Sequence, residues 1–512
     1  MARCPERRLR TLAQACAVAV PLLSVGIVQA QEQATRPGNI FTPTLSLSET
    51  YLRSSARVNS GGKGEFVTRV SPGLIWTSRA GRVQGQALYS LDASLYSRRN
   101  DNFALSNNLS GSLRAEVIDN WGYVDAAANI SQRSVSAFGQ QSGNDTFQQN
   151  DNRAEVATVT VSPYVQGSLS GLADYQVRLS GSATNTRGGS SNNSNNASAL
   201  LSLRSPSGRA LLGWGLIAQQ QRVVFSQGRT STNGRVSAEL NFRPVPDLEV
   251  FGSAGQERTD VLLNSNPSYT NWGGGLRWVP SNRTNVELRA DRRYFGDSYR
   301  VTLEHRTART TWRYSASRDA SSGVDPIAGN RPVTIYEILF NQFASSQPDP
   351  VLRDAVVRAL LAVQGINPSD VVGTAPSLTS GVSLQSRQDL SVSWVGVRTT
   401  LFLAASSGQS SQLQSSFVGI PVQSFPVKQS SLTALVSYRL TPISAVNASV
   451  SRQVTPSNGL QVGNNLRSAT LGYSTQLTRT ISLGANARYA VFESLTDPYR
   501  EASASASLNF RF

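Results

Sequence analysis

The chain has 512 residues, of which 39% are hydrophobic and 16% charged, and its 48 basic against 32 acidic residues give a formal net charge of +16. Cys4 and Cys16 are its only cysteines and His305 is its only histidine. This composition excludes a disulfide scaffold, an iron–sulfur centre and a multi-histidine metal site, and predicts no cofactor and no metal. The basic residues, nearly all arginines, are scattered singly rather than clustered, so no nucleic-acid partner is predicted.

The first 30 residues predict a signal peptide. Four arginines lie between positions 3 and 10, an apolar stretch covers 12–28, and small residues precede a cleavage site between Ala30 and Gln31. After this site no apolar run approaches the ~18 residues that a membrane-spanning helix requires. The protein is therefore predicted to be exported, without transmembrane helices.

The rest of the chain alternates with period two. In the last twelve residues, apolar side chains from Ala502 to Phe512 alternate with polar ones from Glu501 to Arg511. Similar alternation covers 83–95, 236–242, 432–440 and 481–489. Segments of about ten alternating residues suit strands that cross a bilayer, although strands of soluble sandwiches and solenoids alternate as well.

The connections favour a membrane barrel. Tight turns are predicted at 78–82, 118–121, 167–171, 205–209, 244–247, 279–283, 307–309, 396–398, 441–444 and 478–480. The connections between them are mostly longer and polar, as at 54–65, 132–153, 184–196, 319–381 and 407–429. Short turns on one side and long loops on the other are typical of outer-membrane barrels. The predicted fold is all-β: one closed, antiparallel, up-and-down transmembrane barrel of about 22 strands (20–24) over 43–512. A short periplasmic segment, 31–42, precedes it.

The two faces of the strands carry different side chains. Trp76, Trp121, Trp278, Trp312 and Trp394 lie near tight turns, where an aromatic girdle is expected. The polar residues that alternate with the apolar ones are predicted to face the lumen, and the arginines among them are candidate pore-lining residues. Each of these arginines could instead form an ion pair with a carboxylate of a neighbouring strand and stabilise the wall. They are Arg69, Arg114, Arg178, Arg235, Arg277, Arg289, Arg300, Arg313, Arg439 and Arg488.

One connection, 319–381, is predicted to be an extracellular loop with a helix at about 350–364. Asp349-Pro350 is a favourable helix start, apolar residues from Val351 to Val363 share one face, and Gly365 ends the run. The preceding apolar residues 335–340 are predicted to pack against this helix. The loop could constrict the mouth or form a docking surface.

Three segments carry a resemblance to a known family. Residues 45–51, 66–73 and 82–89, together with Pro348-Asp349-Pro350 and the terminal Phe512, resemble the PEP-CTERM system-associated outer membrane proteins. The resemblance covers the whole mature length and implies a β-barrel associated with exopolysaccharide export. The family has no established catalytic or ligand residues, so it implies none here.

The leading functional hypothesis is a non-enzymatic outer-membrane channel associated with exopolysaccharide export. The alternatives are a general diffusion porin and a structural or surface-adhesion barrel. No catalytic residues are predicted, because His305 lies at a tight-turn end. Barrels of this strand number in outer-membrane transporters hold a plug; with about a dozen residues between Gln31 and the first strand, a plug of that type is not expected. Phe510 and Phe512 are predicted to be the assembly signal. The expected partners are outer-membrane lipid, the outer-membrane assembly machinery and an exopolysaccharide or its export apparatus.

Overall fold

A computed structural model describes most of the chain from Gly38 onward. The described residues are 38–55, 64–98, 103–141, 152–188, 193–206, 211–262, 267–321, 381–413 and 425–512, with 333–334, 336, 339–340, 353, 357 and 371–372 between them. The predicted signal peptide and the cleavage site at Ala30 and Gln31 lie outside this part of the chain.

Within the described ranges, 22 antiparallel strands form one sheet, and a separate two-stranded sheet accompanies it. The barrel strands are β1 (Asn39–Ser54), β2 (Glu65–Ala80), β3 (Val83–Tyr96), β4 (Phe103–Ile118), β5 (Gly122–Ser134), β6 (Arg153–Leu169), β7 (Ala173–Arg187), β8 (Ser194–Arg204), β9 (Leu212–Phe225), β10 (Ser231–Val245), β11 (Leu248–Thr259), β12 (Ser268–Ser281), β13 (Thr284–Arg293), β14 (Gly296–Arg306), β15 (Thr310–Ser321), β18 (Ser383–Val395), β19 (Thr399–Gln412), β20 (Val427–Thr441), β21 (Ser444–Thr455), β22 (Asn464–Gln476), β23 (Ile481–Ser494) and β24 (Tyr499–Arg511).

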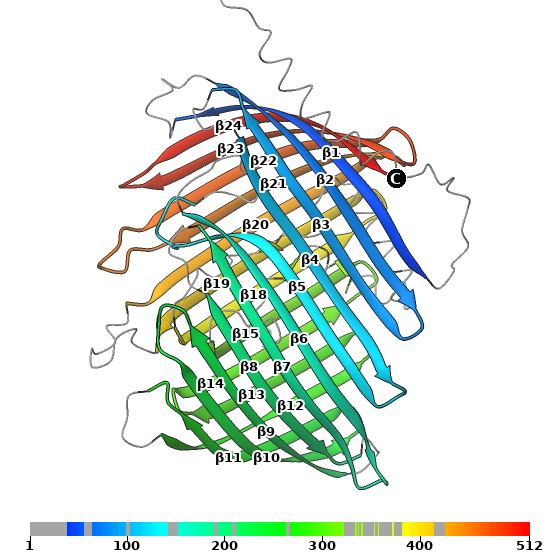
Figure 1. Ribbon diagram of the computed structural model, residues 1–512, viewed down its shortest axis with the longest axis vertical. Coiled ribbons are helices and arrows are strands. Elements are labelled where there is room, and N and C mark those ends of the chain that lie inside the picture. The colour runs from blue at the N-terminus through cyan, green and yellow to red at the C-terminus, as the bar shows by residue number, and fades with distance from the viewer. Residues whose placement is uncertain are drawn as a thin grey trace, which may run out of the picture. The chain divides into compact units, whose positions relative to one another are not determined.

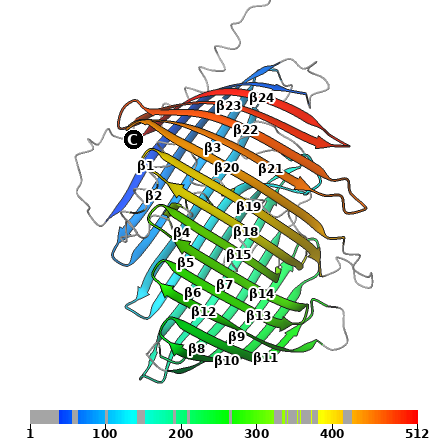
Figure 2. The same ribbon diagram turned by 180° about the vertical axis from the view of Figure 1, so that it is seen from behind.

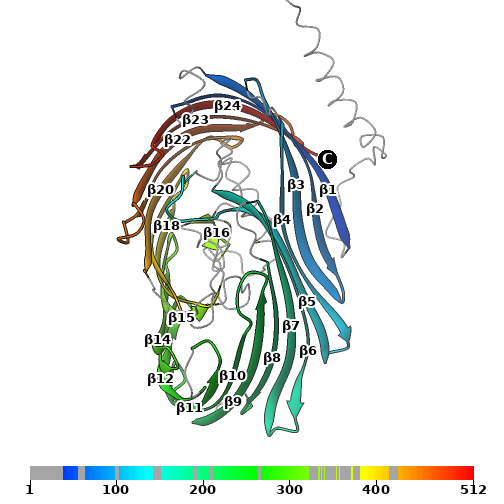
Figure 3. The same cartoon turned by 60° about the vertical axis from the view of Figure 1, so that its left-hand side comes forward.

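The sheet closes on itself. Each strand pairs with its neighbours in the sequence, and β1 pairs with both β2 and β24. Figure 1 and Figure 2 show β24 beside β1, and Figure 3 shows the two sides of the wall facing each other. The predicted closed antiparallel barrel is confirmed. Its first strand begins at Asn39, four residues before the predicted start at Pro43.

The wall has an apolar outer face and a largely polar inner face. Leu240, Val236 and Trp272 are exposed on one parity, at 71%, 51% and 63%. Cross-strand partners keep the same parity around the barrel, so Ser237 and Asn271 lie on the other face and are buried. Side chains of a strand alternate between the two faces, and the exposed apolar set suits contact with lipid.

Short turns join the strands on one side of the barrel. Each of the ten predicted tight turns overlaps a short connection between consecutive strands, for example at Asn120, whose φ of 56° is a left-handed conformation that asparagine tolerates. Trp278 and Trp312 lie on the outer face near these turns, each 46% exposed. Both termini of the barrel lie on this side, which the short turns identify as periplasmic.

The opposite, extracellular side carries the longer connections, some of which pack together. Val261, Tyr294 and Val382 form a buried cluster that joins the connections after β11 and β13 to the start of β18. The connection predicted over 184–196 is shorter, because β7 continues to Arg187 and β8 begins at Ser194. The inner-facing Thr184 and Thr186 are buried there and extend the strand.

The loop predicted over 319–381 is described in part. A two-residue strand β16 (Val333–Thr334) pairs with β17 (Val371–Val372), and β16 lies between the two sides of the wall in Figure 3. The guanidinium of Arg353 lies 4.6 Å from the centre of the Phe340 ring. The apolar packing predicted between the two segments stays a prediction. Arg353 and Val357 are helical, but the full helix over 350–364 stays a prediction. Among the described residues, no helix is long and apolar enough to span a bilayer.

Candidate functional site: the inner face of the barrel

All ten arginines predicted to line the pore lie on the inner face. The register places Arg235 opposite Glu257, Arg277 opposite Glu287, and Arg313 opposite Glu304, in a set whose parity is opposite to that of the exposed apolar residues. Strict alternation in the sequence is what made this placement predictable. Whether any of these arginines contacts a solute stays a prediction.

Two glycines on β12 open space for long side chains. Gly273 and Gly275 face inward between β11 and β13, so β12 contributes no side chain at these two positions. A Cβ atom at Gly273 would lie 2.3 Å from Oδ1 of Asp291, and one at Gly275 would lie 2.5 Å from Cζ of Phe251. Side chains from the flanking strands therefore occupy the space above β12, where glycine allows their close approach.

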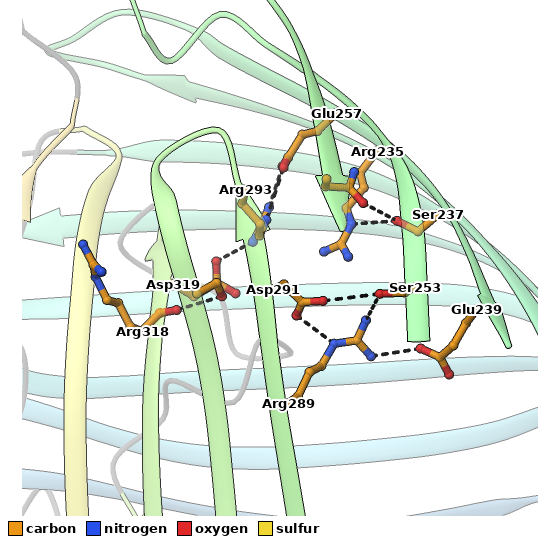
Figure 4. Close-up of polar contacts among 12 residues, drawn as sticks. Arg235, Ser237, Glu239, Ser253, Glu257, Arg289, Asp291, Arg293, Arg318 and Asp319 are labelled. Carbon is orange, nitrogen blue, oxygen red and sulfur yellow. Dashed lines mark hydrogen bonds and ion pairs between the residues drawn. The ribbon is translucent and has the colours of Figure 1, made fainter. Parts of the chain in front are cut away.

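The first charge network uses this space (Figure 4). Arg289 on β13 donates through Nη1 to Oε2 of Glu239, three strands away on β10, at 3.1 Å. Its Nε donates to Oδ2 of Asp291 at 2.8 Å. The hydroxyl of Ser253, on β11, donates to Oδ1 of Asp291 at 3.4 Å across Gly273. One guanidinium thus joins side chains of β10, β11 and β13 across β12.

The second network lies closer to the extracellular end. Arg293 donates through Nη2 to Glu257 and through Nη1 to Asp319, each at 2.5 Å. Glu257 is completely buried and Arg293 is 11% exposed. Burial also raises the pKa of Tyr294, in the following turn, above its ordinary value. The arrangement ties β11, β13 and β15 together through paired charges rather than leaving a free cation in the lumen.

Pairs elsewhere on the wall follow the same rule. Asp125 accepts from Arg114 and from Arg178, both at 2.9 Å, and the Arg178 guanidinium lies over the Tyr164 ring. Arg387 pairs with Asp389 at 2.7 Å. Carboxylates thus accompany these arginines, whereas Arg235 donates to the Ser237 hydroxyl at 2.9 Å.

Hydroxyl and amide groups occupy much of the remaining inner face. Hydroxyls meet across strands at 2.7–3.3 Å, in the pairs Ser406–Ser431, Ser451–Ser468 and Thr158–Thr184. At the seam between β1 and β24, Ser46 donates to Asn509 at 2.7 Å. Such groups can exchange hydrogen bonds with water or with the hydroxyls of a solute.

A segment after β5 crosses part of the interior. Residues 135–141, here called the strap, reach the inner face of β24 and β22, which lie five and seven strands from β5 in the order of the sheet. The phenol of Tyr499 donates to the Gln141 carbonyl at 2.7 Å, and Asn464 donates to the Ala137 carbonyl at 2.9 Å. At the wall, Tyr499 belongs to an apolar cluster with Leu466, Ala490 and Phe492.

The strap was missed by sequence reasoning. The sequence analysis identified 132–153 only as a long polar connection and assigned it no role. The available signal was the pair Ala137-Phe138 within that polar stretch, together with an inward-facing Phe492 and Tyr499. Contacts between residues more than 300 positions apart depend on barrel closure and leave no local pattern.

A groove on the outer face is a different kind of site. Its volume is about 450 Å³, over β7–β12, and most of the residues that line it face outward, among them Ala199, Leu201, Ala218, Val236, Gln256 and Arg258. It therefore faces lipid rather than the lumen. Across the described ranges, no group of three His, Cys, Asp or Glu side chains is placed to hold a metal ion.

The fold and its two faces define a bacterial outer-membrane β-barrel. No protein-family model matches the sequence, and no curated protein matches it. Similar solved structures include the ferric enterobactin receptor PfeA of Pseudomonas aeruginosa (10% identity, TM-score 0.46, covering 94% of this chain and 81% of that one). The iron transporter FrpB of Neisseria meningitidis has 10% identity and a TM-score of 0.47, with coverage of 92% and 82%. The siderophore receptor PirA of Acinetobacter baumannii has 8% identity and a TM-score of 0.48, with coverage of 94% and 81%.

Proposed function

We propose that the protein is a non-enzymatic channel for uncharged or weakly charged hydrophilic solutes. The observation that carries this proposal is the character of the inner face, where hydroxyl and amide groups alternate with arginines paired to carboxylates. A channel selective for anions would expose unpaired cations, as rings of arginine or lysine do in anion pores. Paired charges instead connect neighbouring strands of the wall. The uncharged polar groups then remain available to form hydrogen bonds with the solute.

Within this class, we propose an exopolysaccharide as the solute, as the resemblance to the PEP-CTERM-associated proteins implies. Neutral glycans present many hydroxyls and little charge, which suits rows such as Ser503, Ser505 and Ser507 on the inner face of β24. The export apparatus would be the corresponding partner. A general diffusion porin would use the same lumen without preferring a polymer, and a structural or adhesion barrel would need no open lumen.

Permeation separates these functions. In proteoliposomes, we expect swelling with neutral sugars, at rates that fall with sugar length, and block by long neutral oligosaccharides added in excess. Entry of short sugars without block by long ones would favour the porin. Folded barrels that admit no sugar would contradict the channel.

A second experiment tests the polymer. Removing the protein from a producing strain should leave exopolysaccharide inside the envelope and lower the amount released, and wild-type protein should restore release. Unchanged release, together with slower uptake of small solutes, would contradict the role in export and leave the porin.

A further inference from the structure

Arginines gather on the outer face of the barrel at its extracellular end, on the strands around the seam. Arg452 on β21 lies directly opposite Arg467 on β22. Continuing the same row, Arg467 lies opposite Val491 on β23, and Val491 lies opposite Arg500 on β24. Arg53, near the end of β1, is also on this face and exposed. These four residues, here called the arginine row, come from strands that lie side by side in Figure 1 and Figure 2.

The arginine row is only partly neutralised. Arg467 pairs with Glu493 at 3.3 Å, with both side chains about half exposed, and Arg452 donates to the Asn465 side chain at 3.2 Å. In the described part of the chain, the side chains of Arg53 and Arg500 have no hydrogen-bond or ion-pair partner. Side chains directly opposite one another lie about 5 Å apart, and like charges in such pairs repel. A negatively charged ligand would remove this repulsion.

The next outward-facing row toward the periplasm is apolar. On β21 to β24 it consists of Val450, Ala469, Tyr489 and Ala502, in register with one another, and on β1 it ends at Arg53, which lies opposite Ala502. Val450 and Tyr489 are 56% and 51% exposed, as expected for side chains that face acyl chains. Arg452, Arg467 and Arg500 therefore lie where the apolar wall ends, at the level of the headgroups of the outer leaflet, and Arg53 lies one row nearer the periplasm.

We propose that the arginine row binds a phosphorylated glycolipid of the outer leaflet, with its phosphates on the guanidinium groups and its acyl chains on Val450 and Tyr489. Guanidinium groups bind phosphate through paired hydrogen bonds, and a basic cluster beside an apolar surface suits an anionic lipid. The extracellular position commits the site to a lipid of the outer leaflet rather than to a phospholipid of the inner one.

The test measures lipid A bound to the purified, full-length barrel by native mass spectrometry. The variant Arg452→Gln/Arg467→Gln/Arg500→Gln removes three charges of the arginine row. The matched control, Arg283→Gln/Arg309→Gln/Arg398→Gln, removes three charges from periplasmic turns. Each arginine near an anionic surface contributes about fivefold in affinity, so we expect the first variant to lose roughly a hundredfold and the control to keep wild-type affinity.

Two further lipids test which chemical group of the ligand is recognised. Dephosphorylated lipid A and phosphatidylglycerol should both bind much more weakly than lipid A. Equal binding of lipid A by the first variant and the wild type would overturn the proposal, and so would equal binding of phosphatidylglycerol or of the dephosphorylated lipid. If the triple variant does not fold, Arg500→Gln alone serves, because its side chain has no partner in the described residues. It should lose about fivefold, and unchanged affinity would contradict the site.

Discussion

Glu257 is the most deeply buried carboxylate of the inner-face networks. It is completely buried and pairs with Arg293, which keeps Asp319 as a second partner. Removing one member of a buried ion pair costs about 3–5 kcal/mol, because the remaining charge stays desolvated. With Asp319 still in place, we expect Glu257→Gln to lower the free energy of unfolding by roughly 2–3 kcal/mol. Urea unfolding in lipid vesicles, followed by tryptophan fluorescence, measures this loss.

The control for this prediction is an exposed pair. Asp119 and Arg82 form an ion pair at a periplasmic turn, with both side chains more than 60% exposed. Exposed pairs contribute about 0–1 kcal/mol, so Asp119→Asn should change stability by less than about 1 kcal/mol. Equal losses in the two variants would contradict a structural role for the buried network.

The close packing around Gly273 leaves no space for a side chain at this position. An added Cβ would lie 2.4 Å from the Ala290 carbonyl oxygen, a backbone atom that cannot move aside easily. We expect Gly273→Ala to destabilise the barrel by about 1–3 kcal/mol through overpacking. At Gly252, on the neighbouring strand β11, a Cβ would meet nothing within 4 Å, so Gly252→Ala should be neutral or slightly stabilising. The same unfolding assay compares them, and a neutral Gly273→Ala would show that β12 relaxes.

Sequence parity predicted which arginines face inward but not what they bind. A period of two fixes the face of every residue in a regular strand, so Arg69 and Arg488, far apart in the chain, were assigned to the inner face in the same way. The partner of Arg289 could not be predicted in this way, because Glu239 lies three strands away. That contact depends on register, wall curvature and the two glycines of β12 together, and none of these is local.

At the scale of elements, the strap is held to the wall by a small number of contacts. Tyr499 and Asn464 each donate one hydrogen bond to its backbone. Each such bond contributes about 1 kcal/mol, so Tyr499→Phe/Asn464→Ala should weaken docking by roughly 2 kcal/mol. If the strap narrows the passage, this variant should show a larger single-channel conductance than the wild type.

The control for the strap is a tyrosine on the same part of the wall but on its other face. Tyr489, on β23, is 51% exposed and faces outward. Tyr489→Phe should leave conductance unchanged. An unchanged conductance in the Tyr499→Phe/Asn464→Ala variant as well would show that the strap does not limit the passage.

Turns and strands were predictable because their signals are short-range. Short breaks at 396–398 and 478–480 separate alternating segments, and the structure places turns there. The shortened connection at 188–193 was mistaken for a longer loop, since the serines and asparagines around it resemble loop residues. In the structure, part of this polar stretch faces the lumen from β7 and β8, where polar side chains are the rule.

At the scale of the whole molecule, closure depends on the last strand. The Phe512 amide donates to the Pro43 carbonyl at 3.0 Å, which extends the seam to the final residue, and its side chain is 60% exposed. We expect Phe512→Ala to lower the amount of folded barrel in the outer membrane, measured by heat-modifiable mobility of membrane fractions. Leu495→Ala, at an 85% exposed apolar residue of an extracellular connection, should insert normally. Equal insertion of both would contradict the predicted assembly signal at Phe510 and Phe512.

The lumen itself is tested most directly by single-channel recording in a planar bilayer under a salt gradient. With hydroxyl-rich walls and paired charges, we expect a steady conductance with a reversal potential near zero, reduced by added neutral oligosaccharide. The Tyr499→Phe/Asn464→Ala variant should conduct at least as well. A correctly inserted barrel that passes no current in either form, or a strongly anion-selective current, would contradict a polar channel with a compensated inner face.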